Sequence, residues 1–502
     1  TPIMSSPVVA AKAMTVKYWA HTCTSCGTDF DIEASSPRLS PSAPLYVAPS
    51  EKNFVVSSKA TTTKCPKCDT GISVNLGKSK NKKVNLSLLV TPQWLKGGNK
   101  TGKTGLPMGG SSQDDAESTG RWIDLRAGVD NLIEVRGELP PELVWPEQGI
   151  SMRTGKDGGT VPKRSNFACA ACGTVQDLTT AVRATKKTAP IAPYAIHGHS
   201  RSRQAQGTGY SGRFFSALDS TLSRQYAAAA KEWETRRNTD LADYWPQSAI
   251  PEGLTTTVKD VLPNGHGFDT WSSMFNSRQL LSHALLLRAI LTSGEYSNEC
   301  RAFVLAAFQQ YIRNNNLFTI WNIQADQLEP FFSNNNYNPK NTTVENNLFA
   351  DFGRGNWKAC LEGLYETLAW KENPWETVSI ENIRRRSSSL AENFSSKSTK
   401  VFPGDPVGEA NVRCRSATDL SDIPSATIDL VITDPPFGDN IQYAELSDFF
   451  YVWLRLARHK LKFQYFDSEL SPKSLEVVTN QFREGKDADA FFQRLLTGAW
   501  TE

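Results

Sequence analysis

Paired cysteines restrict the fold of this 502-residue chain more than any other feature. Six of its nine cysteines form three Cys-x-x-Cys pairs, Cys23/Cys26, Cys65/Cys68 and Cys169/Cys172. Two such pairs present four thiolates, the usual ligand set of a structural Zn²⁺ ion. We therefore predict that Cys23, Cys26, Cys65 and Cys68 hold one zinc ion and close the loop of 38 residues between Cys26 and Cys65.

The same spacing bears on the redox compartment. No secretory signal precedes the pairs, so they indicate metal binding in a reducing compartment, which predicts a cytoplasmic protein. The third pair, Cys169/Cys172, has no second pair nearby. His197 and His199 can complete a metal site with it, but a lone turn, or pairing with a segment outside the chain, fits the sequence as well. Cys300 and Cys360 are expected inside helix cores, and Cys414 in a strand.

Charge alone does not identify a partner. The net charge is +3, so any basic surface must come from local clustering. Lys78, Lys80, Lys82 and Lys83 form such a cluster, which can contact phosphates or simply lie on a solvated face. The chain has no run of 18 apolar residues, so no membrane partner is predicted.

Changes in composition suggest four regions. Apolar periodicity predicts amphipathic helices over 278–291, 298–312 and 357–370, the first capped by Asn276 or Ser277. The predicted regions are a zinc ribbon and linker over 1–105, an irregular β-rich part with the third cysteine pair over 106–210, a helical part over 211–400, and an α/β part over 401–502.

The α/β part contains the candidate catalytic motif. Thr427 to Ile432 is a nearly continuous apolar run, which is typical of a buried parallel strand. Pro435 and Pro436 must end such a strand, because proline cannot donate to a ladder. A helix is expected next, with Phe449, Trp453 and Ala457 on one side. Ligands of doubly wound sheets bind beyond the carboxyl ends of the strands, which is where Asp434 would lie.

The residues Asp434, Pro435, Pro436 and Phe437 suit methylation of an amino group on a nucleobase. The lone pair of such an amine is delocalised into the ring, so the amine is a weak nucleophile. A carboxylate that accepts its N–H frees the lone pair, and a backbone carbonyl at the prolines can accept the second N–H. Phe437 can stack on a flipped base and return about 1–3 kcal/mol of the few kcal/mol that flipping costs.

These residues carry a resemblance. The segment 429–437 resembles motif IV of amino-methylating DNA methyltransferases. The longer run to Leu454 resembles the adenine-specific DNA methylases with a zinc ribbon, which carry a DUF1156 domain and often occur in bacterial antiphage defence clusters. Segments 265–295 and 348–376 are similar as well. The resemblance implies methylation of adenine N6 in DNA with S-adenosylmethionine as cofactor, and a helical middle region that reads the target.

The fold implied is α/β, a Rossmann-like methyltransferase half with a zinc-ribbon insertion and a helical middle region. The resemblance places Ser416, Thr418 and Asp419 near the cofactor, together with Asp434. The family's D-P-F-x-G-x-G cofactor loop has no counterpart here, and Phe437 replaces the commoner Tyr. The Rossmann-like half is therefore expected to be incomplete and to need a partner protein or a missing segment. Two alternatives are an RNA or other base-amine methyltransferase, and a non-catalytic zinc-containing nucleic-acid-binding subunit.

Overall fold

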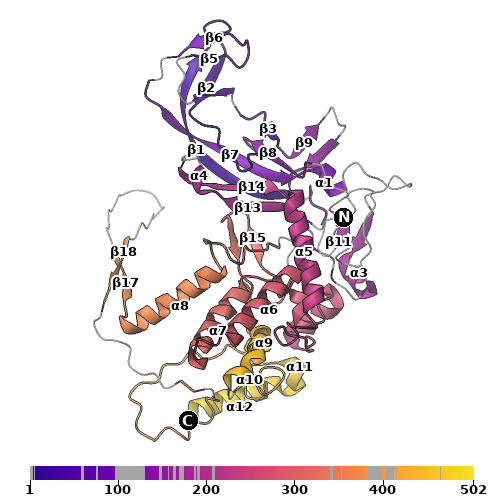
Figure 1. Cartoon of the computed structure of the whole chain (residues 1–502), viewed down its shortest axis with the longest axis vertical. Helices are drawn as coiled ribbons and strands as arrows, with labels where there is room; N and C mark the ends of the chain where they lie inside the picture. The colour runs from indigo at the N-terminus through magenta and orange to yellow at the C-terminus, as the bar shows by residue number, and fades with distance from the viewer. Residues whose placement is uncertain are drawn as a thin grey trace.

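The computed structural model describes residues 4, 6–51, 53–57, 62–74, 77–96, 130–145, 150–155, 158–161, 166–168, 174–185, 188, 191, 193–205, 210–339, 343–351, 353–380, 397–402, 412–413, 415–463 and 465–501. It contains a six-stranded mixed sheet, further two-stranded sheets and a group of helices. The N-terminal strands lie at one end of the molecule and the helices at the other (Figure 1). The prediction of a mixed α/β chain is confirmed at this level.

The six-stranded sheet has the order β3-β8-β7-β1-β2-β4. Its strands are β1 (Val8–Thr22), β2 (Asp29–Glu33), β3 (Leu45–Val47), β4 (Phe54–Val56), β7 (Lys80–Val90) and β8 (Leu132–Arg136). The long strands β1 and β7 pair antiparallel in the centre, whereas β3 runs parallel to β8 and β4 parallel to β2. Within β1, only residues 18–22 pair with β2, and within β7, only residues 86–90 pair with β8. Between these parts, β1 and β7 pair with each other alone, so this stretch of the sheet is two-stranded.

Alternating side chains explain why β1 and β7 form this pair. Met14 and Val16 of β1 are buried, as are Val84 and Leu86 of β7. They pack in one core with residues on and beside the hairpin of β13 (Ala195–His199) and β14 (Arg213–Ala217). Residues between these buried positions point to solvent, as the period of two in a strand requires.

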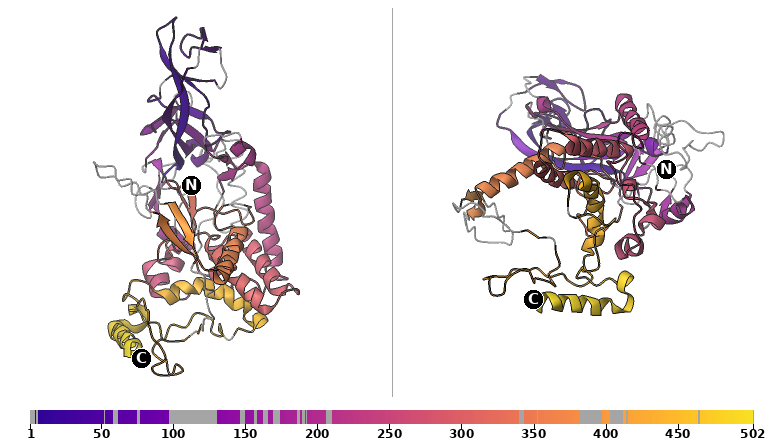
Figure 2. Two further views of the ribbon diagram at one scale, coloured as in Figure 1. Left: turned by 90° about the vertical axis from the view of Figure 1, so that its left-hand side faces the viewer. Right: turned by 60° about the horizontal axis from the view of Figure 1, so that its bottom comes forward.

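Small elements complete the N-terminal half. The hairpins are β5 (Thr62–Lys64) with β6 (Gly71–Ser73), β9 (Glu142–Trp145) with β10 (Ile150–Arg153), and β11 (Asn166–Ala168) with β12 (Val175–Asp177). The short helices are α1 (Pro92–Lys96), α3 (Leu178–Thr185) and α4 (Arg201–Ala205). Figure 2 shows that the end of β1 and β2 where the chain turns from one strand to the other projects away from the helices.

The three predicted helices are confirmed as α6 (Ser277–Thr292), α7 (Asn298–Arg313) and α8 (Trp357–Glu372). One side of α6 and of α7 is buried as expected, whereas no residue of α8 is fully buried. The cap of α6 is Asn276, whose side chain accepts from the Gln279 N–H at 2.9 Å. The Gln279 side chain accepts from the Asn276 N–H at 3.1 Å, which completes a capping box. Before α6 lie α5 (Ser220–Arg236), η3 (Leu254–Lys259), η4 (Leu262–His266) and η5 (Trp271–Met274). Of the helices that the structure describes, none combines the length and apolar character needed to cross a bilayer.

The C-terminal helices are α9 (Tyr443–Leu454), η6 (Arg455–Ala457), α10 (Arg458–Leu461), α11 (Gln481–Glu484), η7 (Gly485–Asp487) and α12 (Ala488–Thr501). Of these, α9, η6 and α10 share the core of the middle region. The expected apolar side of α9 is confirmed, because Phe449 and Trp453 are fully buried. One core joins them to Trp271 and Phe308. β17 (Glu376–Ile380) and β18 (Lys397–Val401) form a separate hairpin next to α8 (Figure 1).

Two cysteines and one histidine lie on α6, α7 and α8. Cys300 was expected in a core and that prediction is wrong, because its position in the first turn of α7 faces solvent. Cys360 of α8 is half-buried and packs against the main core. His283 is fully buried, with Nε2 2.8 Å from the Asn315 carbonyl and Nδ1 3.2 Å from the Tyr311 hydroxyl. These contacts make His283 a core residue.

A buried carboxylate links the hairpin of β15 (Ile320–Asn322) and β16 (Gln327–Glu329) to the N-terminal part of the chain. It belongs to Asp326, which lies at the turn between these strands. Its oxygens accept from the Tyr210 hydroxyl at 2.8 Å and from Arg213 at 2.9 Å, and Lys12 lies 3.6 Å away. Asp326 has φ 58°, a left-handed conformation that costs energy for a residue other than glycine. We call Asp326 with Tyr210, Arg213 and Lys12 the Asp326 clasp. Its hydrogen bonds and ion pairs offset the cost of the left-handed conformation.

Candidate functional site

The four cysteines of the first two pairs lie on two knuckles of the same geometry. One knuckle joins β1 to β2 and the other joins β5 to β6. In the first, the Cys23 N–H donates to the Thr28 carbonyl at 2.9 Å; in the second, the Cys65 N–H donates to the Thr70 carbonyl at 3.0 Å. The residue after the second cysteine of each knuckle, Gly27 or Asp69, has positive φ. The two knuckles therefore present their thiols in equivalent ways.

The sulfur positions fit a metal ion. Sγ atoms are 3.6 Å apart between Cys23 and Cys68, and 3.7 Å apart between Cys26 and Cys65. All four lie within 4.8 Å of one another. Thiolates placed tetrahedrally around a centre at the zinc–sulfur distance of about 2.3 Å are about 3.8 Å apart. The prediction that these cysteines form one cluster able to hold a metal ion is confirmed.

Hydroxyl groups support this four-cysteine centre. Thr28 Oγ1 lies 3.2 Å from Cys26 Sγ, and Thr70 Oγ1 lies 3.2 Å from Cys68 Sγ. The contact with Thr28 lowers the pKa of Cys26 to about 6, and that with Thr70 lowers the pKa of Cys68. Metal binding requires deprotonated thiols, so both hydroxyls favour the ligand form of Cys26 and Cys68, whereas burial raises the pKa of Cys65 to about 11.

Cys169 and Cys172 lie outside the described residues, so a site at the third pair stays a prediction. His199 of that site is described and ends β13. The other described histidine of that site is His197, also on β13. Its ring packs 4.6 Å from the Phe215 ring and 4.9 Å from the Trp321 ring. His197 Nε2 lies 3.3 Å from the Tyr210 hydroxyl, next to the Asp326 clasp.

The strand expected over 427–432 is not formed, and this prediction is wrong for the described chain. Its apolar side chains face solvent, with exposed fractions of 57% for Ile428, 73% for Leu430, 74% for Val431 and 84% for Ile432. From Ile428 to Pro436, no backbone group hydrogen-bonds to another residue that the structure describes. A strand forms only where another strand pairs with it, and the described residues after β18 contain no strand.

The candidate catalytic residues lie at the end of this exposed stretch, which we call the Asp434 segment (residues 427–437). Asp434 is exposed, Pro435 and Pro436 are half-buried, and Phe437 is 72% exposed. Neither the carboxylate nor the ring is turned into the interior, so both are accessible to a ligand.

The chain is fixed immediately after Phe437. Gly438 has φ 58° and its carbonyl accepts from the Thr479 N–H at 3.1 Å. The Gln442 side chain donates to the Thr479 carbonyl at 3.1 Å and accepts from Asn480 at 2.8 Å. The Asp434 segment is therefore held at its carboxyl end.

The residues that the resemblance places near a cofactor form their own turn. Ser416 Oγ and Thr418 Oγ1 are 2.8 Å apart, and the Thr418 N–H donates to Ser416 Oγ at 3.2 Å. The hydrogen bond with Ser421 lowers the pKa of Asp419. In the described part of the chain, no hydrogen bond or ion pair joins this turn to Asp434. The strand expected at 412–414 is not formed at Val412 and Arg413, and Cys414 lies outside the described residues.

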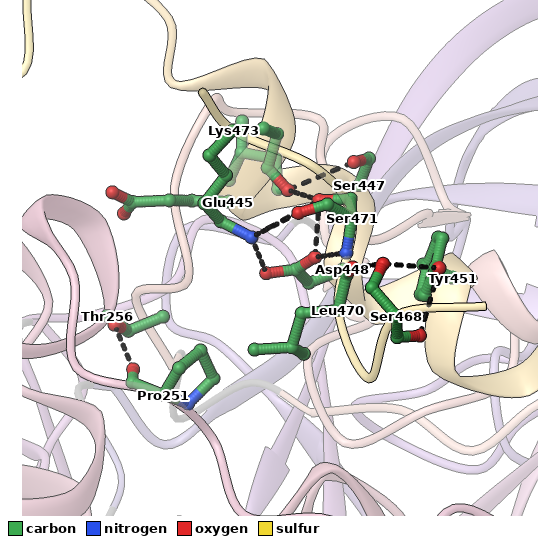
Figure 3. Close-up of polar contacts among 12 residues, drawn as sticks. Pro251, Thr256, Glu445, Ser447, Asp448, Tyr451, Ser468, Leu470, Ser471 and Lys473 are labelled. Atoms are coloured by element: carbon green, nitrogen blue, oxygen red, sulfur yellow. Dashed lines mark hydrogen bonds and ion pairs between the residues drawn. The ribbon is translucent and has the colours of Figure 1, made fainter. Parts of the chain in front are cut away.

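Two buried carboxylates on α9 were missed in the sequence. Asp448 accepts from the Ser471 N–H at 2.9 Å and from Lys473 Nζ at 2.8 Å (Figure 3). Glu445 accepts from the Thr255 N–H at 2.7 Å and from Asn480 at 2.8 Å. Acidic residues three apart on an otherwise apolar helix were the available signal, because such groups are buried only when paired.

These carboxylates line a cavity of about 110 Å³ together with Gly253, Thr256, Lys473 and Arg483. Ligand pockets usually have several hundred Å³, so this one is too small for a nucleoside. Both carboxylates already have hydrogen-bond donors. The network therefore positions α9, and with it the anchor of the Asp434 segment.

No protein-family model, curated protein or solved structure matches this chain.

Proposed function

We propose that this chain is the base-binding part of an S-adenosylmethionine-dependent DNA methyltransferase that modifies adenine N6. The observation that carries the proposal is the exposed Asp434 carboxylate next to an exposed Phe437 ring. Asp434 would accept from the adenine amine, a backbone carbonyl beside Pro435 would accept its second N–H, and Phe437 would stack on the base.

The exposed apolar run supports an incomplete catalytic sheet. Leu430, Val431 and Ile432 are consecutive apolar residues whose side chains are all exposed, and a run of this kind is typical of a strand buried on both faces in a parallel sheet. We propose that polypeptide outside the described residues supplies the neighbouring strands. The resulting sheet would place Asp434 at the carboxyl end of a strand, where such folds bind their ligands.

The cofactor would contribute an electrophilic methyl group. Ser416, Thr418 and Asp419 offer hydroxyl and carboxylate oxygens on an accessible turn, which suits the polar groups of S-adenosylmethionine. We also propose that the ion of the four-cysteine centre is zinc, since four thiolates at these separations are its structural ligand set. That ion would stabilise the knuckles and take no part in methyl transfer.

The test compares Asp434→Asn with Asp467→Asn, an exposed control carboxylate on the same part of the chain. Tritium transfer from S-adenosylmethionine to DNA would be measured with the full chain and any natural partner bound to it. Asp434→Asn should lower turnover roughly 10²–10³-fold, as loss of one transition-state hydrogen bond does elsewhere. Retained turnover in Asp434→Asn would exclude the assigned role.

The second candidate is a non-catalytic, zinc-containing nucleic-acid-binding subunit. The missing strand at 427–432 favours it, because the catalytic sheet is not formed by the described residues. Isothermal titration with S-adenosylmethionine distinguishes the two. Heat of binding in the presence of the natural partner supports the methyltransferase, and no heat in any state supports the binding subunit.

A further inference from the structure

The two-stranded part of the β1/β7 pair has one face open to solvent. In its register, Lys17 lies opposite Asn81 and Thr15 opposite Lys83. Directly opposed residues of an antiparallel pair share a face, so these four side chains lie together. All four are exposed, as is Asn85 two residues after Lys83. We call these five residues the lysine face.

The lysine cluster noted in the sequence is divided between the two sides of the sheet. Lys82 points to the opposite side, where Nζ lies 2.6 Å from Asp31 and 2.8 Å from Glu33. Its charge is therefore neutralised by two largely buried carboxylates. Lys17 and Lys83, in contrast, form no ion pair with another described residue.

Positive charge is concentrated on the part of the molecule formed by β1, β2, β5, β6 and β7, which we call the arm. Residues 11–33, 62–74 and 77–87 contain eight lysines, three aspartates and one glutamate, which gives +4, whereas the whole chain carries +3. One aspartate, Asp69, is paired with Lys64 at 2.9 Å. Lys67, Lys78 and Lys80 are exposed near the knuckles. A local excess of this size on a mildly charged chain is the electrostatic footprint of a polyanion site.

The shape of the arm selects the kind of polyanion. The opposite side of the same strands is covered, since Val16 and Val84 are buried in the sheet core. The lysine face is thus a rigid antiparallel ribbon with lysine, asparagine and threonine side chains on its open side. The major groove of B-DNA, about 12 Å wide, admits a two-stranded ribbon, and these side chains bond phosphates and base edges.

We propose that the lysine face binds duplex DNA, with Lys17 and Lys83 on phosphates and Asn81 and Asn85 facing the groove. The proposal rests on the proposed function only for the choice of DNA as the nucleic acid. Methyl transfer at Asp434 is a separate event at another place on the chain.

The experiment measures binding of the full chain to a short fluorescein-labelled DNA duplex by anisotropy at several salt concentrations. The double variant Lys17→Gln, Lys83→Gln should bind roughly tenfold more weakly and lower the salt slope by about two, one for each lost phosphate contact. The control variant Lys231→Gln, Lys371→Gln removes the same charge from exposed positions on α5 and α8. It should bind like the wild type.

Several outcomes would overturn the proposal. Equal weakening of DNA binding in both double variants would show a non-local effect of charge. Failure of the wild-type chain to bind the duplex at low salt would show that the lysine face is not a DNA-binding site. Tighter binding of duplex RNA would exclude the groove assignment, because the A-form major groove is too narrow for the ribbon. Loss of binding with wild-type metal content and melting temperature supports the proposal. Lysine-dependent DNA binding without S-adenosylmethionine binding would refute the methyltransferase and leave this inference intact.

Discussion

The four-cysteine centre and the Asp434 segment differ in where their partners come from. Each knuckle is closed by its own backbone hydrogen bonds, and all four sulfurs come from described residues. The Asp434 segment is anchored on one side only, while its backbone and its apolar side chains from Ile428 to Ile432 remain open. A knuckle is a local structure, whereas a strand depends on its neighbours in space. Four variants probe this difference.

The largest effect is expected at the four-cysteine centre. Cys26→Ser removes one ligand, and structural zinc contributes about 10–16 kcal/mol to small zinc domains. We expect loss of the metal and faster hydrogen exchange in β1, β2, β5 and β6, measured by metal analysis and mass spectrometry. Cys300→Ser, at an exposed cysteine on α7, is the matched control and should change neither. A full zinc content in Cys26→Ser would contradict the assigned ligand set.

The anchor of the Asp434 segment should be the next most sensitive. Asp448→Ala leaves Lys473 without its buried partner, which should lower the free energy of unfolding by about 3–5 kcal/mol. Urea denaturation would measure it. Asp351→Ala breaks an exposed ion pair with Lys358 and should cost about 1 kcal/mol or less. Equal losses of unfolding free energy in the two variants would mean that the ion pair of Asp448 contributes no more stability than the exposed one of Asp351.

The core that supports α9 should weaken in acid. Burial lowers the pKa of His283 to about 4 from 6.5, so the unfolded chain binds a proton more readily between these values. Stability from this residue is present above pH 6.5 and is lost as the pH falls to 4, on the order of 3 kcal/mol. Urea unfolding across this range should show a smaller acid loss for His283→Gln than for His459→Gln, which changes an exposed histidine. The same loss in both would argue against His283 as its source.

The smallest effect is expected in the Asp434 segment itself. Ile432→Asp should change the free energy of unfolding by less than about 0.5 kcal/mol, because its side chain is already in water. Leu287→Ala, at a fully buried position of α6, should cost about 2–5 kcal/mol in the same measurement. A cost above about 1 kcal/mol for Ile432→Asp would show that this segment packs against something in the free chain.

Local patterns in the sequence were sufficient for several elements. The spacing of Cys23, Cys26, Cys65 and Cys68 predicts the four-cysteine centre, and apolar periodicity with an Asn276 cap predicts α6. Helix α6 depends on residues within a few turns of one another, and the four-cysteine centre depends on two short knuckles. Their energetics are therefore readable from short stretches of sequence.

Long-range partners could not be read in this way. The apolar run at 427–432 is a good strand pattern, but pairing requires neighbours that the described residues lack. Likewise, nothing local shows that Lys82 turns inward to Asp31 while Lys83 points outward. The strand register decides that division, and it is set by distant pairing between β1 and β7.

The Asp326 clasp determines how the protein can be divided. A cut between β14 and α5 would leave Tyr210, Arg213 and Lys12 in one fragment and their shared carboxylate in the other. The first fragment would hold two facing cations without a counterion, and the second a hairpin tip in a costly conformation without its ligands. Expressing the sheet and the helices as separate pieces would therefore destabilise both. The angle at which the cysteine-bearing arm stands off the helices is a property of the uncut chain.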